Sequence, residues 1–148
     1  MDEVMRSKIL GIIASQSDMT IATLRDDGFP QATMVSYASE GLTLYFGTAA
    51  SSQKASNIAR NNRVSVVINH PYQDWLHIRG LSMGAIAERI TDRNEIGRIG
   101  RFFISKFPQV VNYLPAHETE LAMFRVTPKV ISVLDYSKGF GHTDLVFV

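Results

Sequence analysis

The sequence predicts a mainly β, antiparallel domain of six or seven strands with two or three peripheral helices, arranged as a small barrel. Three observations predict it. Short segments rich in β-branched residues recur along the chain, such as Arg63 to Asn69 (RVSVVIN). Brief turns join several of them, and such turns connect antiparallel strands. The chain has 148 residues, 45% of them hydrophobic and 20% charged, which predicts one domain over residues 1–148.

The first part of the chain predicts a helix followed by three strands. In Asp2 to Ser15, apolar residues recur at offsets of three and four, which indicates one face of a helix. Met19 to Leu24 and Gln31 to Tyr37 are expected to be strands joined by a tight glycine turn. A second turn at Ser39-Glu40-Gly41 leads into Leu42 to Phe46, so the three strands are expected to form a meander.

The middle of the chain predicts a short helix and then longer strands. Gln53 to Arg60 is expected to be helical, capped by one of the two serines before it. The buried strand 63–69 follows. Leu76 to Ile90 supplies one long bent strand or two, with Gly80 and Gly84 as candidates for bulges.

The last part predicts an amphipathic helix and two further strands. The helix begins after Thr91 or Asp92 and ends at Pro108, and we expect its arginine- and lysine-bearing sides to be solvated. A short segment follows it over residues 110–114. Two final strands are expected at Glu120 to Val126 and Val130 to Leu134, separated by a proline.

Charge and composition exclude several classes of function. Fifteen basic and fourteen acidic residues give a net charge of +1, which argues against a nucleic-acid partner. The chain has no cysteine, so disulfides, thiolate metal sites and cysteine nucleophiles are excluded, and a reducing cytoplasmic location is expected. The start of the chain lacks the pattern of a signal peptide, and no apolar stretch approaches the ~20 residues of a membrane span. We therefore expect no membrane partner.

The sequence motifs give little support to a hydrolytic enzyme or to a metal site. A G-x-S-x-G motif is absent, and no acid–base pair stands out, so no catalytic side chain is assigned. The four histidines do not have metal-ligand spacing, and we expect no metal site. They are His70, His77, His117 and His142. We expect Glu118 and Glu120 to be exposed residues at a strand edge.

Gly47 to Lys54 is the most informative segment for binding. There a strand ends among small and hydroxyl residues and a helix begins. The free N–H groups and positive end of a helix favour a phosphate, and Thr48, Ser52 and Lys54 would complete such a cradle. The required glycines of a Walker loop are missing. From the residues alone, an ordinary capped helix after a strand remains the alternative.

An ordered set of short motifs extends over residues 19–134. It includes Leu44-Tyr45-Phe46-Gly47-Thr48, Ser52-Gln53-Lys54, Asn61-Asn62-Arg63-Val64-Ser65, Gly84 to Ile90, and Phe124-Arg125-Val126-Thr127-Pro128. In this order the motifs resemble the pyridoxamine 5′-phosphate oxidase-like family of flavin-binding split barrels. The resemblance implies a split β-barrel of the FMN-binding type.

The resemblance also implies a function and a site. It implies an FMN-dependent oxidoreductase that acts on a small molecule and forms a homodimer with the site at the subunit interface. NADH or NADPH is a plausible electron donor, and a deazaflavin is an alternative cofactor. The FMN phosphate would be bound by Gly47, Thr48, Ser52, Gln53 and Lys54. The flavin ring would lie along Thr33, Met34, Val35 and Ser36, with Arg79 contributed by the neighbouring subunit and Trp75 a candidate to flank the site.

Two departures from the family pattern leave alternatives open. Ala32 stands near where the true oxidases have a phosphate-binding arginine, and Asp135 to His142 lacks their arginine- and histidine-rich end. Pyridoxamine phosphate is therefore not the expected substrate. Gly139-Phe140-Gly141 is similar to haem-utilisation relatives, so haem binding through His142 or His70 is an alternative. A second alternative is a flavin carrier or sensor without turnover. A third is a dimeric barrel whose cleft binds no cofactor.

Overall fold

A computed structural model of the chain describes residues 1–113 and 120–148. Its framework is an antiparallel sheet in the order β2-β1-β5-β6-β7-β4-β3, with β8 paired to β7 outside this path. The strands are β1 (Asp18–Leu24), β2 (Pro30–Ser36), β3 (Ala38–Glu40), β4 (Thr43–Ala49), β5 (Arg63–Asn69), β6 (Arg79–Arg89), β7 (Leu121–Asp135) and β8 (Thr143–Phe147). The mainly β, antiparallel split-barrel class is thus confirmed.

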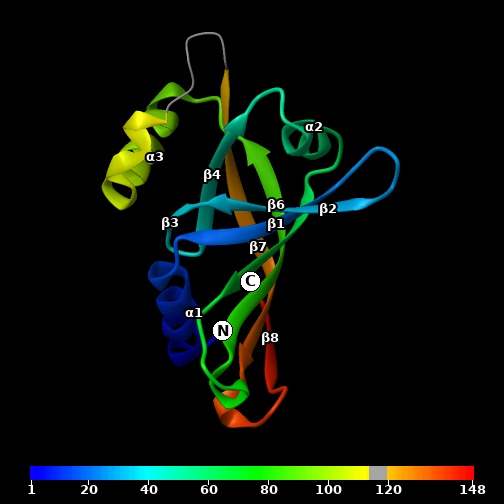
Figure 1. Cartoon of the computed structure of the whole chain (residues 1–148), viewed down its shortest axis with the longest axis vertical. Coiled ribbons are helices and arrows are strands. Elements are labelled where there is room, and N and C mark those ends of the chain that lie inside the picture. The colour runs from blue at the N-terminus through cyan, green and yellow to red at the C-terminus, as the bar shows by residue number, and fades with distance from the viewer. Residues whose placement is uncertain (114–119) are drawn as a thin grey trace.

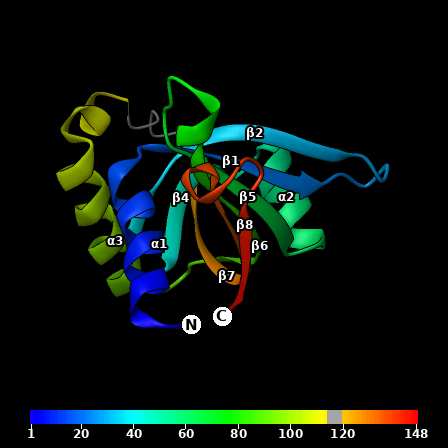
Figure 2. The same ribbon diagram turned by 90° about the horizontal axis from the view of Figure 1, so that it is seen from below.

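Within residues 1–113 and 120–148, three α-helices and three short 3₁₀ segments accompany the sheet. The α-helices are α1 (Glu3–Ser15), α2 (Gln53–Arg60) and α3 (Arg93–Lys106), and the 3₁₀ segments are Trp75–His77, Pro108–Asn112 and Tyr136–Lys138. Figures 1 and 2 show the sheet curling strongly, with α1 and α3 on one side and α2 on the other. Figure 1 also shows the β1–β2 hairpin reaching out from the body of the molecule. None of the helices in the described residues is long and apolar enough to cross a membrane.

The alternation of apolar residues places one face of each strand in the core. In β5, Val64, Val66 and Ile68 are buried while their neighbours face outward, so the bounds expected from the sequence are confirmed. The core also takes Ile9 of α1. Phe46 and Phe124 stack with their ring centroids 5.2 Å apart, which fixes β4 against β7.

The expected meander is wrong. β1 and β2 do form a hairpin, with Gly28 at a φ of 88°, but β4 pairs with β3 and β7 at the other edge of the sheet. Tyr37 is the single residue between β2 and β3, and its buried hydroxyl donates to the Ile13 carbonyl at 2.6 Å. The chain therefore crosses from one edge to the other at a residue fixed in the core.

The last two predicted strands are one strand, β7, which continues through Pro128. The pairing with β6 shifts at this point: Gly84 lies opposite Val130 and Ala85 opposite Pro128, which leaves Lys129 unpaired. A bulge of this kind accommodates a proline, which has no N–H to donate. The bulge expected at Gly84 is confirmed. Strand β8, in which exposed and half-buried residues alternate, was not predicted from the sequence.

A partly buried ion pair joins α1 to the end of β7. Lys8 Nζ donates to the Asp135 carboxylate, and Ser137 Oγ donates to the same group at 2.6 Å. Asp135 is 4% exposed. These hydrogen bonds, the one from Lys8 first, lower the pKa of Asp135 from 3.8 to about 2. The contact holds α1 in place across the sheet.

Asp135→Asn is expected to lower the free energy of unfolding by about 2 kcal/mol at pH 7. A carboxyl with a lowered folded-state pKa stabilises the fold above its unfolded pKa of 3.8, and this stability is lost as pH falls toward 2. Urea unfolding at pH 7 and at low pH measures it, with Asp27→Asn in the exposed pair with Arg25 as control. If wild type and Asp135→Asn differ in free energy of unfolding by the same amount at both pH values, the stabilisation does not come from the ionised Asp135 carboxylate.

Helix α3 is held by the buried Ile99, by the partly buried Phe102 and Phe103, and by charged contacts. Its cap is Asp92, whose side chain accepts from the Asn94 N–H at 3.0 Å. The basic sides are largely solvated as expected, with an exposed ion pair at Arg98 and a partly buried contact at Lys106. Arg98 pairs with Glu40 at 2.6 Å, and Lys106 donates to the Tyr37 carbonyl at 2.9 Å.

Candidate functional site

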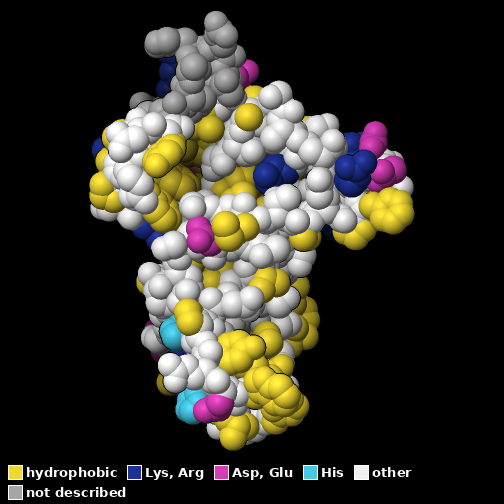
Figure 3. All heavy atoms as spheres, in the orientation of Figure 1, with side chains coloured by type: hydrophobic (Ala, Val, Ile, Leu, Met, Phe, Trp, Pro, Cys, Tyr) yellow, Lys and Arg dark blue, Asp and Glu magenta, His cyan; other side chains and the backbone are white. Residues whose placement is uncertain are grey.

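A cavity of about 700 Å³ lies between α3 and the sheet. Strands β2, β4 and β7 form one side, and α3 with the following 3₁₀ segment forms the other. Figure 3 shows a hollow lined with hydrophobic side chains beside α3. Its size falls within the range of small-molecule sites, so it is the candidate functional site of this chain.

The strand side of the cavity brings together residues that are distant in sequence. Of the ten residues expected to bind the cofactor, six line this cavity: Met34, Val35, Ser36, Gly47, Thr48 and Lys54. Three come from β2, two from β4 and one from α2. They meet because the sheet curls and brings β4, which lies next to the edge strand β3, back beside β2 at the opposite edge.

Polar groups gather where β4 ends and α2 begins. Thr48 Oγ1 donates to Ser52 Oγ at 3.1 Å, and Ser52 caps α2 by accepting from the Ala55 N–H at 3.2 Å. The Gln53 and Lys54 main-chain N–H groups, in the first turn of α2, have no acceptor among residues 1–113 and 120–148. Lys54 forms no ion pair within the same residues. This end of the cavity therefore offers a cation and N–H donors to an anion.

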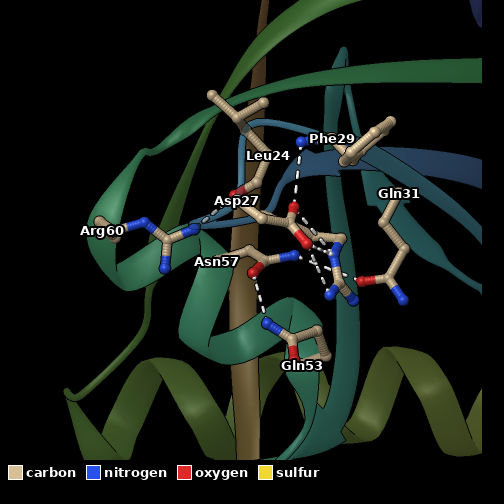
Figure 4. Close-up of polar contacts among 8 residues, drawn as sticks. Leu24, Asp27, Phe29, Gln31, Gln53, Asn57 and Arg60 are labelled. Carbon is tan, nitrogen blue, oxygen red and sulfur yellow. Dashed lines mark hydrogen bonds and ion pairs between the residues drawn. The ribbon is translucent and has the colours of Figure 1, made fainter.

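Three other predicted residues, Thr33, Ser52 and Gln53, do not line the cavity. Thr33 pairs with Ile21 in the hairpin and does not line the cavity. Gln53 Nε2 donates to Asn57 Oδ1 at 2.8 Å, so the amide of Gln53 is used within α2 (Figure 4). Ser52 reaches the cavity only through its hydrogen bond with Thr48.

Asn57 is a positioning residue that was not predicted from the sequence. Its side chain is fully buried, and its Nδ2 donates to Thr23 Oγ1 at 3.0 Å and to Gln31 Oε1 at 3.4 Å. Figure 4 shows the contact of Asn57 with Gln31 beside the one from Arg60 to the Leu24 carbonyl. Together they fix α2, and hence Lys54, against the β1–β2 hairpin. A polar residue on the apolar face of a short helix was the signal in the sequence.

The opposite wall of the cavity was also missed. It consists of residues from α3, from the segment after it and from the start of β7: Ile96, Gly100, Phe103, Ile104, Phe107 and Met123 among them. The apolar stripe Ile96, Ile99, Phe102 and Phe103 predicts an apolar face of α3, but the same pattern fits an amphipathic helix at the surface. Of these four residues, only Ile99 is fully buried. The others are less buried, and part of this face borders the cavity.

A family model described as pyridoxamine 5′-phosphate oxidase matches residues 5–135. The chain belongs to this family. No curated protein sequence matches it.

Solved structures resemble this family member over nearly all of its length. A haem binding protein of Mycobacterium smegmatis aligns with a TM-score of 0.82 at 19% identity, over 99% of this chain and 59% of that one. A conserved hypothetical protein of Mycobacterium tuberculosis aligns with a TM-score of 0.79 at 25% identity, over 97% of this chain and 91% of that one. HutZ, the haem storage protein of Vibrio cholerae, aligns with a TM-score of 0.71 at 15% identity, over 83% of this chain and 89% of that one. The chain thus spans less than two thirds of the M. smegmatis protein.

In this pyridoxamine 5′-phosphate oxidase family member, the remaining predicted residue lies away from the cavity. Arg79 begins β6 and pairs in register with Asp135, whereas the cavity lies at the Leu121 end of β7. Trp75 is exposed and contacts Phe140, also away from the cavity. Within one chain, therefore, neither residue reaches the site.

None of the histidines in the described residues lines the cavity. His142 Nε2 lies 3.1 Å from Asp144 Oδ2, and His70 Nδ1 lies 2.9 Å from the Pro71 carbonyl. His117 and Glu118 lie outside the described residues. No group of three or more His, Asp or Glu that could hold a metal occurs in residues 1–113 and 120–148.

Proposed function

We propose that the chain binds FMN in the cavity and acts as a flavin-dependent oxidoreductase on a small molecule. One observation carries the proposal. Lys54 borders an apolar cavity without an ion-pair partner among the described residues, next to the first turn of α2. Family membership supports the choice of a flavin.

The residues present fit FMN in two parts. A phosphate would accept hydrogen bonds from Lys54, Thr48 and the first-turn N–H groups of α2, which favour an anion. A flavin ring would lie between the β2 residues and the apolar wall of α3. When bound, FMN supplies the hydride and electron transfer, while the protein binds and orients it. The side chains named here hold the cofactor and exclude water.

Titration of the purified protein with FMN and with riboflavin tests the proposal. The two differ only in the phosphate, so FMN is expected to bind tighter by roughly five- to 150-fold, as for a charge-assisted hydrogen bond of ~1–3 kcal/mol. Equal affinity for the two, or no flavin binding, would contradict the site. Reduction of bound FMN by NADH or NADPH then separates an oxidoreductase from a carrier, whose flavin neither these donors nor a substrate panel would reduce. A deazaflavin is tested in the same titration.

A second candidate function is haem binding. The structural similarity to the haem binding protein of M. smegmatis and to HutZ favours it. Titration with haemin, followed by the Soret band, tests it directly. If His142 is the ligand, His142→Ala is expected to abolish that band; if no band forms in wild type, this candidate fails.

We also propose that the chain forms a homodimer with the site at the subunit interface. Exposed apolar side chains at the rim of the cavity, those of Met34, Leu121 and Tyr113, support this. A second copy is also the only source from which Arg79 would reach the site, since the structure places it away from the cavity of its own chain. Sedimentation velocity of the FMN-loaded protein measures the state, and a monomer with full FMN occupancy would contradict it.

A further inference from the structure

We infer that Lys106 favours the reduced form of a flavin bound in the cavity, through its positive charge. This inference rests on the proposed function, because it concerns a cofactor bound between β2 and α3. Lys106 is the last residue of α3, and its Nζ donates to the Tyr37 carbonyl at 2.9 Å. Tyr37 directly follows Ser36, a lining residue from β2. Lys106 therefore lies at the edge where the α3 wall of the cavity meets the β2 wall.

Two aromatic rings enclose the ammonium group of Lys106. Its Nζ lies 3.9 Å from the centroid of the Tyr37 ring and 5.4 Å from that of Phe107, which lines the cavity. The faces of such rings attract a cation and take the place of water around it. Lys106 is half-buried; its burial lowers the pKa of the ammonium group, and the negative charge of Asp18 partly opposes this. Solvent therefore screens this charge less than it screens the charge of an exposed lysine.

Other charged groups near this edge cancel one another or act in the opposite direction. Two arginines are paired with glutamates: Arg98 with Glu40, and Arg125 with Glu95. Within each pair the two charges largely cancel. The Asp18 carboxylate accepts from Ser36 Oγ at 2.8 Å, which brings a negative charge to the β2 wall. Asp18 is therefore expected to oppose the effect of Lys106 on a bound cofactor.

Reduction of a flavin creates the charge that Lys106 would stabilise. A hydride from a reduced nicotinamide brings two electrons and one proton to the neutral oxidised ring, which gains one negative charge while the nicotinamide is oxidised. The charge of the phosphate stays the same, so Lys54 does not distinguish the two forms. A cation held beside the ring favours the reduced form. With an effective dielectric constant of about 20, two unit charges even roughly 10 Å apart change such an equilibrium about tenfold.

Reductive titration of the FMN-loaded protein against a reference dye measures the midpoint potential of the bound cofactor. Lys106→Gln, which removes the charge but keeps a hydrogen-bond donor, is expected to lower the equilibrium constant for reduction roughly tenfold, or ~30 mV for a two-electron couple. Lys106→Arg keeps the charge and is expected to retain the wild-type potential. Lys129→Gln is the matched control, because Lys129 is exposed at the bulge of β7 and does not line the cavity. It is expected to leave the potential unchanged.

Asp18→Asn tests the same edge with the opposite sign. It removes the negative charge but keeps an acceptor for Ser36 Oγ, so it is expected to raise the potential. A potential that stays the same or falls in this variant overturns the inference, and so does an unchanged potential in Lys106→Gln. An equal shift in Lys106→Gln and Lys106→Arg also overturns it, because the role of Lys106 would then be structural.

The comparison holds in a dimer as well. Arg79 contributed by a second subunit would be present in every variant alike, so differences between variants report the charges of Lys106 and Asp18. A protein that binds FMN at a potential that none of these substitutions shifts overturns this inference alone. A wild-type protein that binds no FMN overturns the proposed function as well.

Discussion

Lys54→Ala is expected to weaken FMN binding by roughly five- to 150-fold, the equivalent of ~1–3 kcal/mol for a charge-assisted hydrogen bond. The reason is local. Lys54 is the charged residue of the described cavity lining, and it lies at the first turn of α2, so its removal leaves a bound phosphate with only neutral donors. Fluorescence titration with FMN measures the change. Riboflavin affinity is expected to stay the same, because riboflavin has no phosphate.

Two controls separate this effect from a general loss of charge. Lys129→Ala removes a lysine at the bulge of β7, which does not line the cavity, and is expected to leave FMN affinity unchanged. Raising the salt concentration is expected to weaken FMN binding in wild type more than in Lys54→Ala, because salt screens the charge. If Lys54→Ala weakens FMN and riboflavin equally, the phosphate is not bound at this residue.

Ile99→Ala is expected to release α3 from the sheet. Ile99 is fully buried, and it forms a small cluster with Tyr45 and Ile90 that is separate from the main core. Truncating a buried isoleucine costs ~2–5 kcal/mol, and Ile99 is the one fully buried residue that α3 contributes to this cluster. Hydrogen exchange is expected to accelerate in α3 while the amides of β5 and β6 remain protected. FMN affinity is expected to fall with it, since α3 forms one wall of the cavity.

Ile9→Ala is the matched control for this experiment. Ile9 is equally buried, but it belongs to the main core beneath α1. Its truncation is expected to lower the free energy of unfolding of the whole sheet and to speed exchange in β5 and β6. Similar exchange patterns in the two variants would show that α3 and the sheet unfold as one unit, contrary to the prediction.

Local features of the fold could be predicted from the sequence, whereas long-range pairings could not. The alternation in residues 63–69 gave β5 with its observed bounds, and Ser52 and Asp92 cap helices as expected. The turn before β4 was recognised, but turn chemistry does not say which strands pair, so the meander was wrong. Pro128 was read as a break because a proline disrupts a regular ladder, and only the bulge opposite Gly84 removes that conflict.

One side of the candidate site could likewise be predicted from the sequence, and the other could not. The strand side was predictable because its residues belong to short motifs that resemble a known family. The α3 wall was not, since an amphipathic helix that borders a cavity has the same periodicity as one that packs on a core. Asn57 shows a third case. Its burial depends on Thr23 and Gln31, which come from other strands, so no local pattern identifies its partners.

The sheet order has a consequence for how the chain folds during synthesis. β4 is made early, but its main partner is β7, and α1 is held by an ion pair between residues 127 apart in sequence. Pairings of such high sequence separation form slowly. A nascent chain that has not yet produced β7 therefore exposes open edges on both β4 and β6, and open edges of this kind recruit other chains. Protection by chaperones would matter most while the segment between β6 and β7 is being translated.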